Sequence, residues 1–425
     1  MRASRLFVLL TVAATVLAGG AGGAAAAPTS LEVLGHANPG VGANADVYGH
    51  RGHAYLGSWV GAGCLSNGVR VFDLQNPRQP RHVSTFADKV SDPGLAGTWT
   101  EKIVVQHVNS VSFVGELAVV SIQACSRTSN AFRGFGLYDV TNPALPEKLA
   151  LFPTEQQTGG SHEIWLQNKG NRAYVYTAIP RAELLTSPDG VTPGNPDFRI
   201  IDVSDPRNPV QVGAWGAWRE LGIHPDPPGP AANLVHSVVV NGTATRAYLS
   251  YWDLGTVILD ISDPTDPTFL GRTTFLPGEP GNAHSAWLAH GGNVLVETHE
   301  SFSAPSSSQV GVPTIHDISD PVNPVRLSTF TRPDLSDLGE TVHDPKVHGN
   351  KLFLSWYQEG VVVVDISRPA SPELVTQFVP PADFVNPDFE FCLVEPCTSI
   401  WGVFVDRDYV LASGESNGLW VLKLR

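Results

Sequence analysis

Short runs of apolar and β-branched residues recur along this chain, and each run ends at an aspartate that is soon followed by two prolines. Residues 69–86, VRVFDLQNPRQPRHVSTF, show the full pattern of strand, turn and second strand. β-Branched residues favour strands, whereas proline interrupts a strand and favours a turn. The pattern therefore predicts a repeated β-hairpin, with further copies at 136–152, 198–215, 256–273, 313–330 and 361–378.

The aspartate of each copy stands at the end of the first hairpin strand. Its carboxylate can accept backbone N–H groups of the turn that follows. We therefore expect a structural role for these six residues, which are Asp73, Asp139, Asp202, Asp260, Asp317 and Asp365.

Another pair of strands precedes each hairpin, as in HSVVVNGTATRAYLSYW (236–252) and HDPKVHGNKLFLSWY (343–357). One unit is then four antiparallel strands, which is a β-propeller blade. The last unit, 399–425, contains three strands, and LEVLGHA (31–37) is similar to a fourth strand. We expect this N-terminal strand to complete the last blade. The prediction is an all-β, seven-bladed propeller that forms a single domain over residues 27–425.

The turn sequence DVSDPRNP and the strand VVVVD (361–365) resemble the LVIVD-repeat family of secreted and surface β-propellers of bacteria and archaea. The resemblance extends over nearly all of residues 27–425. It implies the propeller fold, and it implies no particular activity, because the family has no single one.

Residues 1–26 have the order of a secretory signal peptide. Arg2 and Arg5 precede an apolar run over 6–17, and small residues follow up to Ala26. This run is too short to span a bilayer, so we expect a secreted, extracellular monomer without a membrane span. Without the two arginines the chain has 25 basic and 41 acidic residues, a net charge of −16. Such a surface repels nucleic acid and anionic lipid.

Four cysteines in an exported chain predict disulfides. Cys392 and Cys397 are close enough in sequence to close one loop. Cys64 and Cys125 occupy matching places in successive units and can join neighbouring blades. Three pairings are possible from the sequence alone.

The long connections all belong to one face of the predicted ring. They are the loops between second and third strands and the links between units, whereas the remaining turns are short. Loops on a rigid scaffold concentrate function, so this face is the candidate site. The long segments are 87–106, 125–134, 180–197, 217–233, 301–311 and 379–397.

Five units share a histidine near the first strand, and Asp46 takes that place in the first unit. Since first strands are innermost, we expect five imidazoles to meet at one mouth of the central channel. Each ring could donate to the backbone of the next blade, line a pocket for an organic molecule or anion, or bind Cu, Fe or Zn. The five are His107, His162, His236, His284 and His343.

Glu163 and Asp344 directly follow two of these histidines and could orient metal ligands or act as the acid/base group. The first hypothesis is a pocket that binds or transforms a small molecule by metal-assisted oxidation or hydrolysis. At the level of fold alone, a ring of histidines on the innermost strands of a propeller is similar to the four-histidine iron site of carotenoid oxygenases. The alternative is a non-catalytic propeller that recognises an extracellular protein or glycan.

Aromatic and polar residues near second-strand ends have two interpretations. Trp59, Trp252 and Trp356 either pack between blades or form an aromatic rim around a ligand. Glu297, His299 and Glu300 either form a solvated strand end or add a polar wall to the pocket.

Overall fold

The computed structural model describes most of the chain after residue 28. The predicted signal peptide (1–26) and Cys392 lie outside the described residues. Within the part that is described, no helix is both long enough and apolar enough to cross a membrane. The described ranges are 29–40, 42–59, 64, 67–279, 281–301, 311–332, 341–384 and 397–425.

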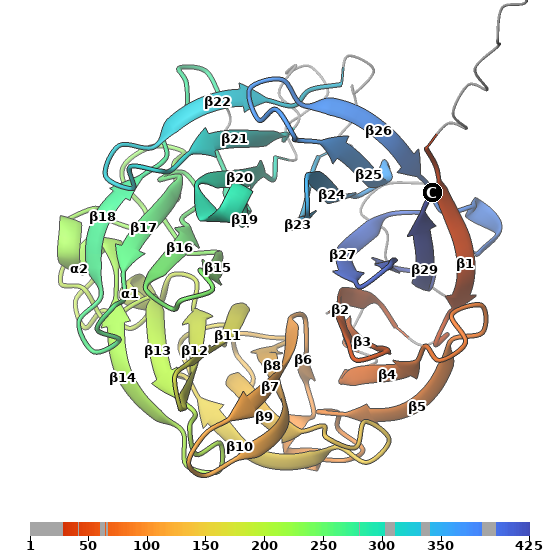
Figure 1. Cartoon of the computed structure of the whole chain (residues 1–425). Coiled ribbons are helices and arrows are strands. Elements are labelled where there is room, and N and C mark those ends of the chain that lie inside the picture. The colour runs from red at the N-terminus through yellow and green to blue at the C-terminus, as the bar shows by residue number, and fades with distance from the viewer. Residues whose placement is uncertain are drawn as a thin grey trace, which may run out of the picture.

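Seven antiparallel sheets surround a central axis, as Figure 1 shows, and the prediction of a seven-bladed all-β propeller is confirmed. Blade 1 contains β2 (Asn44–His50), β3 (His53–Ser58), β4 (Val69–Asp73) and β5 (Arg81–Phe86). Blade 2 contains β7 (Ile103–Asn109), β8 (Val114–Ala124), β9 (Gly134–Asp139) and β10 (Glu147–Pro153), and the short β6 (Thr98–Trp99) pairs with β8. Blade 3 contains β11 (Glu163–Lys169), β12 (Arg172–Ala178), β13 (Phe198–Asp202) and β14 (Val210–Trp215).

The remaining blades repeat the same order from the axis outwards. Blade 4 contains β15 (Ser237–Val240), β16 (Arg246–Ser250), β17 (Thr256–Asp260) and β18 (Thr268–Arg272). Blade 5 contains β19 (Ala283–Ala289), β20 (Val294–His299), β21 (Pro313–Asp317) and β22 (Val325–Thr329). Blade 6 contains β23 (Pro345–His348), β24 (Lys351–Trp356), β25 (Gly360–Asp365) and β26 (Glu373–Phe378). Blade 7 contains β27 (Ile400–Asp406), β28 (Tyr409–Gly414), β29 (Gly418–Leu424) and β1 (Leu31–Ala37).

The ring closes through the first strand. β1 pairs antiparallel with β29, from Leu31 opposite Leu424 to Ala37 opposite Leu419, so it is the outermost strand of blade 7. This pairing covers the free edge that β29 would otherwise expose. The predicted completion of the last blade by the N-terminal strand is therefore confirmed.

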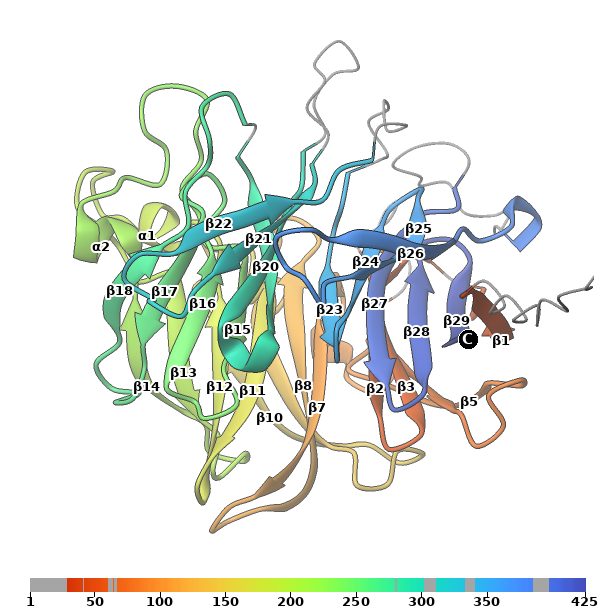
Figure 2. The same ribbon diagram turned by 45° about the horizontal axis from the view of Figure 1, so that its top comes forward.

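Helical segments are few and short, and they lie in connections. Figure 2 shows α1 (Ala182–Leu185) and α2 (Ala217–Leu221) on the upper face, beside the long links of blades 3 and 4. Three single-turn 3₁₀ segments complete the helical content of the described residues: Pro93–Leu95, His290–Gly292 and Ala382–Phe384. The same face carries the starts of the innermost strands β11, β15 and β19.

The six turn aspartates share one geometry. Each carboxylate accepts the backbone N–H of the residue two positions later, at 2.7 to 2.9 Å. The donors are Gln75, Thr141, Ser204, Ser262, Ser319 and Ser367.

The core lies between adjacent blades, where the apolar faces of neighbouring sheets meet. Trp356, for example, is fully buried between blades 5 and 6 and packs against Phe330. A disulfide joins Cys64 and Cys125 in the connections of blades 1 and 2, as predicted. Cys397 is also disulfide-bonded.

Candidate metal centre at one mouth of the channel

Four of the five predicted histidines meet where the innermost strands begin. His162, His236 and His343 directly precede or lie close before β11, β15 and β23, and His284 is the second residue of β19. Neighbouring rings follow one another in an arc. Ring centroids are 4.3 Å apart for His162 and His236, 4.0 Å for His236 and His284, and 4.4 Å for His284 and His343.

His107 does not join this arc, so the prediction that it does is wrong. It is the fifth residue of β7, and its Nδ1 lies 2.9 Å from Glu116. Glu116 also pairs with His50, in the hairpin turn of blade 1 on the opposite face. Because β7 begins at Ile103, the residue at the mouth in blade 2 is Glu101, whose Oε2 lies 3.0 Å from His162 Nδ1.

The residues after these mouth residues form a second, ionic layer. Lys102 Nζ lies 2.8 Å from Asp46 Oδ2, 3.1 Å from Glu163 Oε2 and 3.0 Å from Asp344 Oδ2. All four side chains are almost completely buried. The proposed extra ligand Asp46 and the proposed acid/base groups Glu163 and Asp344 are thus brought together, but around a lysine.

Within this ionic layer, the pKa values of Glu163 and Asp344 are shifted in opposite directions. Burial raises the pKa of Glu163 to about 8, even though Lys102 opposes the change. Burial also acts on Asp344, but Lys102 and Lys346 outweigh it and hold the pKa of Asp344 well below its usual value. Asp344 also accepts a hydrogen bond from Ser285, so its carboxylate is fully engaged.

The backbone fixes the orientation of the imidazoles. His236 Nδ1 donates to the carbonyl of His284 at 3.0 Å, and His343 Nδ1 donates to the carbonyl of Trp401 at 2.6 Å. A carbonyl oxygen only accepts, so the neutral rings carry their protons on Nδ1 and a lone pair on Nε2. The bond to the neighbouring blade is therefore present in these two residues, and in His343 it leaves Nε2 available to a metal.

The available nitrogens converge with a carboxylate. His284, Glu300 and His343 each offer a ligand atom, and these atoms lie within 4.8 Å of one another. His343 Nε2 is buried and has no hydrogen-bond partner among the described residues. Next to them, His162 Nε2 and His236 Nε2 are 2.7 Å apart, so one of the two nitrogens carries a proton and donates it to the other.

Glu300 follows β20, where the sequence is compatible with either a solvated strand end or a polar wall of the pocket. Burial raises its pKa, and Tyr357 donates its hydroxyl to one carboxylate oxygen. Its neighbours Glu297 and His299 lie 2.8 Å from each other and are buried, and Glu297 also accepts from Thr256. Only Glu300 of this group reaches the histidines, because one strand sends alternate residues in opposite directions.

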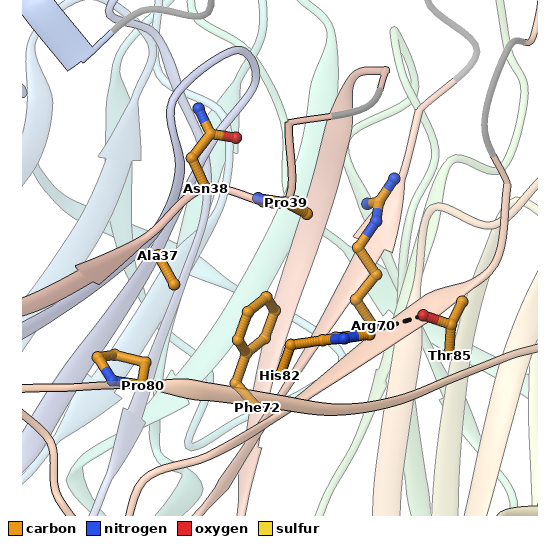
Figure 3. A pocket seen from close by; sticks show the side chains of 8 residues that line it. All are labelled: Ala37, Asn38, Pro39, Arg70, Phe72, Pro80, His82 and Thr85. Atoms are coloured by element: carbon orange, nitrogen blue, oxygen red, sulfur yellow. Dashed lines mark hydrogen bonds between the residues drawn. The ribbon is translucent and has the colours of Figure 1, made fainter.

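A hollow lies away from the four mouth histidines, in the seam between the end of β1 and blade 1 (Figure 3). Its volume is about 470 Å³. His82 is the one histidine that lines it, and its Nε2 is held 2.9 Å from Thr85. No carboxylate lines this hollow, so it does not fit a metal. The lining residues are Ala37, Asn38, Pro39, Arg70, Phe72, Pro80, His82 and Thr85.

Comparison with known families identifies the repeat. The model of the LVIVD repeat matches residues 191–215, 235–274 and 341–379, in blades 3, 4 and 6. The chain carries LVIVD repeats. No curated protein sequence matches this LVIVD-repeat propeller.

Solved structures share the fold of the LVIVD-repeat propeller at low sequence identity. The computationally designed Ika8 protein is 8% identical with a TM-score of 0.50, and the match covers 92% of this chain and 99% of that chain. Raptor of Chaetomium thermophilum is 14% identical with a TM-score of 0.57, and the match covers 93% of this chain but 29% of Raptor. At such identities the likeness concerns the fold alone.

Proposed function

We propose that this LVIVD-repeat propeller binds a first-row transition metal ion through His284, His343 and Glu300, and uses it to bind or transform a small molecule. One observation carries the proposal. His343, whose Nε2 is buried without a hydrogen-bond partner among the described residues, offers a ligand atom within 4.8 Å of ligand atoms of His284 and Glu300. An unsatisfied buried polar atom costs about 1–3 kcal/mol, a cost that a bound metal ion would remove.

The donor set favours particular metals. Two imidazoles and one carboxylate form the ligand set of non-haem Fe(II) sites that keep open coordination positions, while Cu and Zn also bind imidazole well. His236 is next in the arc, and its Nε2 would add a fourth ligand only if the ion replaced the proton that it shares with His162 Nε2. When bound, the ion would act as a Lewis acid or redox centre, in a metal-assisted oxidation or hydrolysis.

The protein's own residues would orient this centre. Tyr357 holds one oxygen of Glu300, and the carbonyl of Trp401 fixes the ring of His343. His162 and Glu300 remain partly exposed, so solvent reaches the edge of the site. Because residues 1–26 have the features of a signal peptide, we propose that the site works outside the cytoplasm.

The test measures metal in untagged protein after reconstitution with Fe(II), Cu(II) or Zn(II). We expect about one ion per wild-type chain with one of these metals, and at least a tenfold loss of affinity in His343→Ala and in the near-isosteric Glu300→Gln. His107→Ala is the matched control, since His107 lies on the opposite face, and it should retain the metal. Circular dichroism checks that each variant is folded.

A wild-type protein that binds none of the three metals would overturn the proposal. So would a folded His343→Ala variant with undiminished affinity. Either result would favour the alternative of a propeller that binds an extracellular protein or glycan.

A further inference from the structure

A closed circuit of aromatic rings surrounds the candidate metal centre. It contains one ring from each blade, in the order Trp59, Trp99, His162, His236, His284, His343 and Trp401. Adjacent ring centroids are between 4.0 Å and 6.4 Å apart, and the contact of Trp401 with Trp59 at 5.1 Å closes the circuit. The mouth is therefore bounded on all sides by aromatic rings.

Two further aromatic residues lie against the histidines from second-strand ends. Trp252 is 5.2 Å from His236 and 6.2 Å from His284, and Tyr357 is 5.3 Å from His343. Trp59, Trp99 and Trp252 are all partly exposed. Aromatic surface that stays open beside buried polar groups is typical of a ligand pocket.

Backbone strain accompanies these two positions. Trp252 has φ of 40° and Tyr357 has φ of 27°, in the left-handed region that bulky residues avoid. Such a conformation is strained and persists only where the surrounding structure holds it. Glycine would adopt this conformation without strain. The presence of Trp252 and Tyr357 at these positions therefore indicates that their aromatic side chains have a role.

The charges at the mouth select among aromatic ligands. Aromatic faces attract cationic ligands, but a bound metal ion would repel a cationic ligand. Two nearby carboxylates are engaged, because Glu101 pairs with His162 and Glu300 belongs to the metal ligands, and burial raises the pKa of a third carboxyl group, Glu415, to about 8. Trp401 adds a buried indole N–H that has no acceptor among the described residues. The surroundings thus fit a neutral or anionic ligand with oxygen acceptors.

We infer that the site takes a flat aromatic compound with an oxygen donor, whose oxygen binds the metal and whose ring packs against Trp252 and Trp59. This inference rests on the proposed metal site. It adds the class of ligand and names the residues that select it.

The test uses two probes with the same metal-binding group. Benzohydroxamate carries a flat ring and cyclohexanecarbohydroxamate a puckered ring of similar size. Calorimetric titration of the metal-loaded protein should show about tenfold tighter binding of benzohydroxamate, since two aromatic contacts at 0.5–1.5 kcal/mol each amount to roughly that factor. Equal binding of the two probes would overturn the inference.

Variants assign the preference to the named rings. Trp252→Leu and Trp59→Leu should lose most of the tenfold preference while they keep their metal. Trp165→Leu is the control, because Trp165 is partly exposed in β11 and contacts Trp287, not the histidines. A preference that survives in both variants contradicts the inference. Metal content, measured on the same samples, reports separately on the proposed function, since a metal-free wild type would fail that proposal first.

Discussion

Single side chains close the hairpin turns of this protein. Asp260 accepts the N–H of Ser262 at 2.7 Å, and this bond lowers the pKa of Asp260 below its usual value. The charged form of the Asp260 carboxylate is therefore more stable in the folded chain than in the unfolded chain, so it stabilises the fold. That stabilisation is complete above the unfolded pKa, near 4, and is lost as the pH falls through the lower folded pKa.

Asp260→Ala should reduce the free energy of unfolding by about 1 kcal/mol at pH 7, because the turn loses an acceptor that solvent partly screens. The difference from wild type should shrink as the pH is lowered to about 3. Urea denaturation at both pH values measures this difference in the free energy of unfolding. Asp266→Ala in the same turn is the control, with an expected change within about 0.5 kcal/mol. A deficit that grows in acid would contradict the assignment.

At the scale of elements, the innermost strands are tied together across the axis. Lys102, just before β7, contacts carboxylates of blades 1, 3 and 6, which are far apart in sequence. Lys102 and two of its partners directly follow mouth residues in sequence, so the cluster fixes the position of the neighbouring histidines along the channel axis. Removing the cation would leave three buried carboxylates without their shared partner.

Lys102→Met should therefore lower the free energy of unfolding by about 3–5 kcal/mol, the usual cost of breaking a buried ion pair. Lys351→Met is the comparison, since Lys351 pairs with Asp365 at a partly exposed site and should cost at most about 1 kcal/mol. Guanidinium chloride adds salt, so urea is the denaturant of choice. Similar losses in the two variants would show that the buried cluster contributes little.

At the scale of the whole molecule, β1 behaves as a true fourth strand. Gly35 in β1, Gly213 in β14 and Gly271 in β18 occupy matching places and each lies against the proline turn of the following blade. A Cβ on Gly35 would stand 2.2 Å from the carbonyl oxygen of Pro77. The seam between blades 7 and 1 thus uses the same close contact as the seams within the chain.

Gly35→Ala should destabilise the ring by about 1–3 kcal/mol, because added volume at a tight contact forces the backbone apart. Gly242→Ala is the control, since nothing lies within 4 Å of a Cβ built there. Thermal unfolding and sedimentation velocity would show a lower Tm, and self-association if the freed edge of β29 pairs with another chain. An unchanged Tm would mean that β1 adds little to closure.

The blade, the turn aspartates and the closing strand can be predicted from the amino-acid sequence, because they depend on local periodicity and turn chemistry that repeat along the chain. The same repeats indicate His162, His236, His284 and His343. Which side chains meet at the mouth, in contrast, follows from the folded ring. The long link before blade 2 places His107 at the far end of β7, whereas Glu300, Trp99 and Trp401 arrive from unrelated positions. The proximity of these residues depends on where each strand begins around the closed ring. Because the residues are far apart in sequence, a local pattern cannot predict that they meet.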